Sequence, residues 1–106
     1  MDRQNHDILN GLPGAERILQ GLLDFHDNRH TIAACLVRIA RPRLVKAGLM
    51  TPSTIPDVDA ELDLYHLLAN EGNQAHSRYN ALLREAVSFE RALDQRMKES
   101  RADSQF

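Results

Sequence analysis

The sequence predicts an all-α protein, and three observations lead to that fold class. Hydrophobic residues make up 42% of the 106 residues but aromatic residues only 5%, with no Trp, so aliphatic side chains and alanine must build most of the core. Leu, Ala, Arg, Glu and Gln are abundant, and the alternation of apolar and polar residues typical of strands is absent. Apolar and small residues in the second half recur at intervals of three and four, the spacing of a helix-packing stripe.

The first half of the chain predicts one long helix after a loose arm. Residues 1–12 are mostly polar and show no periodic stripe, whereas Pro13 suits a first helical position. From there an apolar face continues to residue 47, and Pro42 predicts a bend within it. A break at Asn28 is the alternative, giving two helices instead of one. Gly48 ends the helix, and residues 48–57, with two prolines, predict a loop.

The second half predicts another long helix, with Asp57 or Asp59 as its N-cap. Its seam consists of nine positions: Tyr65, Leu68, Gly72, Ala75, Tyr79, Leu82, Ala86, Phe89 and Leu93. Read alone, the residues around Gly72 would end a helix, but the stripe keeps its phase on both sides, so we expect one helix through this glycine. The helical domain therefore spans residues 13–98, and residues 99–106 form a flexible tail.

Two long helices joined by one loop predict an antiparallel helical hairpin, or a hairpin of three or four helices if breaks occur near Asn28 and Gly72. In the expected register Gly72 faces Ala33, which predicts a narrow waist between the helices. The hairpin leaves apolar residues such as Leu23 and Val87 on its outer flanks. Pairing of two hairpins into a four-helix bundle would bury them, so we expect a homodimer.

Three histidines form a candidate metal site. His26 and His30 are one helical turn apart, and the hairpin register brings His76 opposite them, a set that could ligate a divalent transition metal. The simpler interpretation is that these histidines cap a helix break or lie on a solvated flank.

A basic stretch is the second candidate site. Residues 29–46 hold five cations and no acid, among them Arg38, Arg41, Arg43 and Lys46, which could bind nucleic acid or another polyanion. Residues 51–76, however, hold acids and no Lys or Arg, so the hairpin would pair the two stretches. A net charge of −2 also argues against a nucleic-acid surface.

The remaining sequence features define the expected class of protein. Cys35 has no cysteine partner and is interpreted as a small buried side chain. No catalytic motif, signal peptide or long apolar run is present, so we expect a cytoplasmic protein that is not an enzyme and does not enter a membrane. The sequence predicts a small protein–protein interaction module, an adaptor, chaperone-like or regulatory partner, which acts as a homodimer and binds another protein. A metal-binding bundle and a nucleic-acid-binding regulator are the alternatives.

Overall fold

The structure is a computed structural model that describes residues 8–53 and 59–104. Within these ranges the chain is helical and contains no strand, which confirms the all-α prediction. The main elements, in chain order, are α2 (Ala15–His26), α3 (Ile32–Ile39), α4 (Arg41–Lys46), α5 (Ala60–Glu71) and α6 (Ala75–Ser104).

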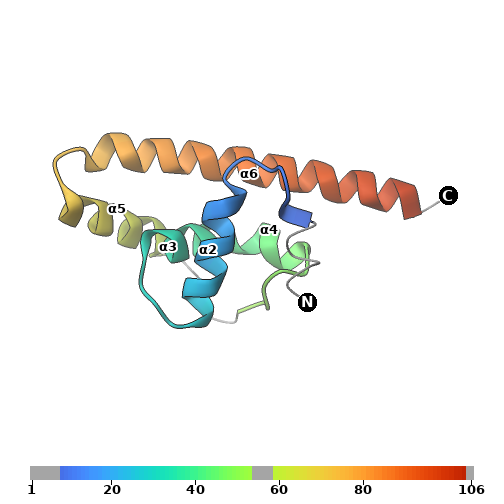
Figure 1. The fold of residues 1–106 in the computed structure, drawn as a ribbon, viewed down its shortest axis with the longest axis horizontal. Coiled ribbons are helices and arrows are strands. Elements are labelled where there is room, and N and C mark those ends of the chain that lie inside the picture. The colour runs from blue at the N-terminus through green and yellow to red at the C-terminus, as the bar shows by residue number, and fades with distance from the viewer. Residues whose placement is uncertain (1–7, 54–58, 105–106) are drawn as a thin grey trace.

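One helix sets the length of the molecule. α6 runs along nearly the whole long axis, and the shorter helices lie against one side of it (Figure 1). The molecule measures 52 × 26 × 23 Å. The core lies between α6 and the shorter helices, and its most fully buried side chains are Phe89, Leu9, Leu44, Leu64, Leu68, Leu93, Val37 and Cys35. Leu9 belongs to the predicted arm, and α6 continues past the predicted domain end at residue 98.

The first half of the chain forms α2, α3 and α4 instead of one helix. α2 ends in a Schellman motif: Asn28, at φ 60°, donates its N–H to the carbonyl of Phe25, and Arg29 donates to that of Asp24. Asparagine tolerates this left-handed conformation better than most residues. The continuous helix was therefore wrong, and the break at Asn28 is the alternative that the structure adopts.

Pro42 starts a new helix instead of bending an existing one. Ala40 ends α3 and also caps α4, and Pro42 lies in the first turn of α4. Proline is tolerated there because the first turn needs no intrahelical N–H donor. Gly48, at φ 79°, then ends α4 with a second Schellman motif, as the sequence predicted. Residues 54–57 of the predicted loop, including Asp57, lie outside the described residues, and Asp59 is the N-cap of α5.

The long second helix is broken at Gly72, which corrects the prediction of a continuous helix. α5 ends at Glu71, Gly72 takes φ 153° and ψ −166°, and α6 begins at Ala75. The chain reverses there, so that the Tyr65 and Tyr79 rings meet edge to face with centroids 5.3 Å apart. The seam residues other than Gly72 are all buried or half-buried. The stripe keeps its phase across the turn because α5 and α6 both face the same core.

The close approach between helices occurs at Gly21, not at Gly72. A Cβ added at Gly21 of α2 would overlap the backbone carbonyl oxygen of Ala33 and lie 2.6 Å from Cγ2 of Val37 on α3. A Cβ added at Gly72 would meet no atom within 4 Å. The predicted waist between the two halves of the chain, with Gly72 facing Ala33, is therefore wrong, because Ala33 packs closely against Gly21 of the neighbouring helix α2.

Candidate functional site

The cations of the predicted polyanion-binding stretch make contacts within the molecule. Nη1 of Arg38 lies 2.9 Å from Oδ2 of Asp63 on α5, and Nε of Arg43 lies 2.9 Å from Oδ2 of Asp94 on α6. Hydrogen bonding from Arg38 lowers the pKa of the Asp63 carboxyl. The expected pairing of basic and acidic stretches thus holds for Arg38, whereas Arg43 pairs with α6.

The two remaining cations of this set differ from each other. Arg41 places its guanidinium carbon 4.9 Å from the centroid of the Phe25 ring, and its Nη1 donates to the carbonyl oxygen of Thr51 at 3.3 Å. Lys46 is exposed and makes no ion pair within the described part of the chain. These four residues therefore do not form a free cationic patch.

The three predicted metal ligands are all exposed, and the structure does not bring them together. His26 is the last residue of α2 and His30 follows the Asn28 turn, so the helical spacing that would pair them is lost. His76 lies in the first turn of α6, 3.3 Å from the Asn80 side-chain nitrogen. No group of three His, Cys, Asp or Glu side chains among the described residues could hold a metal ion.

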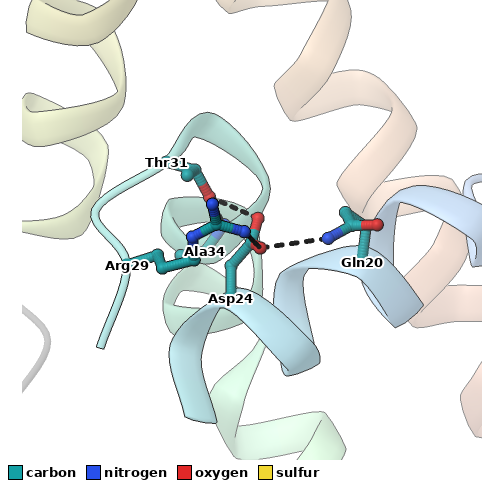
Figure 2. A network of polar contacts seen from close by, with 5 residues as sticks. All are labelled: Gln20, Asp24, Arg29, Thr31 and Ala34. Carbon is teal, nitrogen blue, oxygen red and sulfur yellow. Dashed lines mark hydrogen bonds and ion pairs between the residues drawn. The ribbon is translucent and has the colours of Figure 1, made fainter. Parts of the chain in front are cut away.

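A buried carboxylate, which sequence reasoning did not single out, lies at the α2–α3 turn (Figure 2). Asp24 is 5% exposed, and it accepts hydrogen bonds from Thr31 Oγ1 at 2.8 Å and Gln20 Nε2 at 3.0 Å. Thr31 also accepts a hydrogen bond from the Ala34 N–H at 3.1 Å, as an N-cap does. The bond from Thr31 is the main cause that lowers the pKa of Asp24, and Arg29 lies 3.8 Å away. This carboxylate accepts a hydrogen bond at each of its two oxygens and joins α2 to α3, and its lowered pKa makes it a poor general acid or base near neutral pH.

Burial shifts the pKa values of three further side chains in the described part of the chain. Burial is the main cause of the raised pKa of the Cys35 thiol, which is 0% exposed and therefore disfavoured as a nucleophilic thiolate. Burial also raises the pKa of Tyr79 and of Glu90 on α6. No buried side-chain nitrogen or oxygen lacks a hydrogen-bond partner among the residues described.

An apolar groove lies at the C-terminal end of α2. We call it the α2 groove; it has a volume of about 590 Å³ and is lined by Leu22, Leu23, Phe25, His26, Asn28, Leu49, Met50 and Thr51. Leu23 is 61% exposed, and the other apolar residues of the lining are half-buried. One wall comes from α2 and the other from residues 49–51. In the sequence, the first wall was indicated by Leu23, an apolar residue predicted on an outer flank. The signal for the second wall is the pair of apolar residues, Leu49 and Met50, directly after the helix stop at Gly48.

A second hollow of about 590 Å³ lies at the start of α2, where Gly11, Gly14 and Leu19 are among its lining residues. Arg17 and Glu85 also line it, and their side chains form an ion pair at 3.1 Å. Two of its charged side chains therefore pair with each other, and the α2 groove has the more apolar lining of the two hollows.

Comparison of the chain with protein-family models, with curated proteins and with solved structures found no significant match. None of the helices in the described ranges combines the length and hydropathy needed to cross a bilayer.

Proposed function

We propose that the protein is a non-enzymatic protein–protein interaction module that acts as a helical homodimer and presents its surface to a further protein partner. The α2 groove is the observation that carries this proposal. It places Leu23, Phe25 and Met50 in one contiguous surface region, and apolar regions of this kind mark interaction sites when they are large.

The charged side chains considered for other functions are bonded within the molecule. Arg38 and Arg43 are used in ion pairs between helices, and Asp24 is used in the turn between α2 and α3. Two copies, each contributing two helices, would give the four-helix bundle that the sequence suggests.

The mass of the full chain in dilute solution tests the proposal. Sedimentation equilibrium at micromolar concentration should give twice the 12.0 kDa chain mass, and a monomer would refute the homodimer. Native mass spectrometry after incubation with Zn, Ni, Cu and Fe(II) tests the metal-binding alternative, which predicts that a metal adduct of the protein is detected. Retention on DNA or RNA that weakens with salt would instead favour the nucleic-acid alternative.

A further inference from the structure

We propose that the outward side of α6 docks an acidic helix of another protein, whose carboxylates lie opposite a row of three cations. The row consists of Arg84, Arg91 and Lys98, which follow one another at intervals of seven residues on a single helix. This inference rests on the proposed interaction function and names the chemical class of the further protein partner.

The side of α6 that points away from the shorter helices is continuously exposed, and we call it the α6 face. Its members recur at alternating intervals of four and three residues, the spacing that keeps side chains on one side of a helix. On the opposite side of α6 lie buried residues such as Leu82 and Phe89, against which the shorter helices pack (Figure 1). No described part of the chain covers the α6 face, and all seven of its members are exposed: Ser77, Ala81, Arg84, Ser88, Arg91, Gln95 and Lys98.

Two acidic residues of α6 lie outside this face and pair with other helices. Glu85 lies 3.1 Å from Nε of Arg17 on α2. Asp94 lies 2.9 Å from Nε of Arg43 on α4. Asp94 precedes Lys98 by one helical turn, so its pairing with α4 engages the acid best placed to neutralise the end of the row.

The three cations of the row form no ion pair within the described parts of the chain. The neighbouring acid Glu99 accepts a hydrogen bond from the side chain of Gln95 at 3.3 Å. Glu90 is half-buried, and the charges of Arg43 and Asp94 act on it. The outward side of α6 is therefore positive, although the whole chain carries a net charge of −2.

An acidic helix matches this row in both spacing and shape. Seven residues advance a helix by about 10.5 Å, so carboxylates that repeat every seven residues in a partner helix meet the cations in register. Ala81 and Ser88 flank Arg84 with small side chains, which lets a second helix approach closely. Val87 is 44% exposed and lies within one turn of both Arg84 and Arg91, where it offers an apolar contact beside the ion pairs.

Other occupants fit the α6 face less well. Two copies of this chain that met through the same face would bring their cations together across the two-fold axis. Nucleic acid is bound through an excess of positive potential, whereas this row is one residue wide in a chain of net charge −2. A helix that inserts into a lipid surface needs a broad apolar side, and the α6 face has no large apolar member.

A synthetic helical peptide as long as the α6 face tests the proposal with the full-length chain. The peptide carries glutamate at every seventh position, with leucine beside each glutamate to contact Val87. Amide-resolved NMR at low ionic strength measures the dissociation constant, and the shifted signals should centre on the α6 face. The variant Arg91→Glu turns an attraction at the centre of the row into a repulsion and should weaken binding by about 10-fold.

Two controls separate docking in register from general attraction between charges. Lys46→Glu makes the same change of charge at an exposed α4 residue that forms no ion pair within the described ranges, and it should leave the dissociation constant unchanged. A peptide of identical composition, with its glutamates distributed around the helix, should bind about 10-fold more weakly. Circular dichroism checks that each protein variant keeps its helices.

Reversal of the whole row gives a second, independent test. The triple variant Arg84→Glu, Arg91→Glu and Lys98→Glu should lose the glutamate peptide and bind a peptide with lysine at the same positions. Failure of the lysine peptide to bind this variant overturns the charge complementarity.

The remaining outcomes distinguish this inference from the proposed function. Equal binding of the two glutamate peptides, or equal effects of Arg91→Glu and Lys46→Glu, overturns docking in register. A DNA duplex that binds the row when the glutamate peptide does not overturns the acidic helix as its occupant. Absence of peptide binding to a dimeric chain overturns the docking role of the α6 face and leaves the homodimer standing, whereas binding to a monomeric chain supports that role and refutes only the homodimer.

Discussion

Replacing Gly21 by alanine should destabilise the fold, although alanine is the better helix former. Gly21 lies inside α2, where alanine alone would gain about 1 kcal/mol over glycine. Its new Cβ, however, would overlap the carbonyl oxygen of Ala33 and lie 2.6 Å from Cγ2 of Val37. A backbone oxygen cannot rotate away as a side chain can, so α2 and α3 would have to separate.

The expected cost follows from the balance of these two effects. Overpacking costs about 1–3 kcal/mol, and the rigid obstacle places Gly21→Ala near the upper end. After the helix-propensity gain, the free energy of unfolding should fall by about 2 kcal/mol. For a chain of this size that corresponds to a drop in Tm of roughly 8–15 °C.

Urea unfolding followed by circular dichroism measures this change, with parent and variant at one chain concentration because dimerisation would shift the midpoint. Ala81→Gly, at an exposed position within α6, is the control for helix propensity and should lose about 1 kcal/mol. A Gly21→Ala variant as stable as the parent or more so, beside a normal loss in Ala81→Gly, would refute the close contact of α2 and α3.

Three further predictions concern the turn and the carboxylates. Gly72→Ala and Gly72→Leu should both cost about 1–2 kcal/mol in urea unfolding, because φ 153° is strained for any side chain while no atom lies within 4 Å; a far larger loss for leucine would contradict the open turn. The pKa values of Asp24 and Asp63 are lowered by folding, so their stabilisation is present above about pH 4 and is lost as pH falls through the lowered values. Midpoints measured from pH 6 to pH 2 should show this loss, and Asp24→Asn should make it smaller; an unchanged profile would exclude Asp24 as a contributor. The pKa of Glu90 is raised, mainly by burial, so its charged form opposes folding as pH rises. Glu90→Gln should therefore raise the urea midpoint at pH 7, with a gain that shrinks on acidification, and a gain independent of pH would point to a different cause.

Burial was the most predictable property of the fold. The seam from Tyr65 to Leu93 was read as one buried stripe, and every member except Gly72 is buried or half-buried. Helix ends were predictable where one residue has a strong conformational preference, as at Gly48. The sequence left open whether a helix ends at Asn28, and it favoured a continuous helix through Gly72, which was wrong. An unbroken apolar phase is equally consistent with one helix and with two helices that face a common core.

The candidate site was less predictable than the fold. Leu23 stood out as an apolar residue on an outer flank, but the groove also needs residues 49–51 and the bridge that Arg41 makes to Phe25. These partners are distant in the sequence, and no periodicity connects them. Asp24 was missed for the same reason, since Thr31 becomes its partner only after the chain turns at Asn28.

The sequence by itself determined that the chain is helical and which residues face the core, because amphipathic spacing is a local property of each helix. Only the tertiary structure decided whether the chain breaks at Asn28 and Gly72 and which helix faces meet. A break at Gly72 gives up little helix stability, since glycine is a poor helix former by about 1 kcal/mol. Reversal of the chain there lets α5 and α6 cover one core, and burying a single leucine already contributes about 1.5–3 kcal/mol. The close contact at Ala33 also depends on the tertiary structure, because Gly21 of α2 packs there and Gly72 does not.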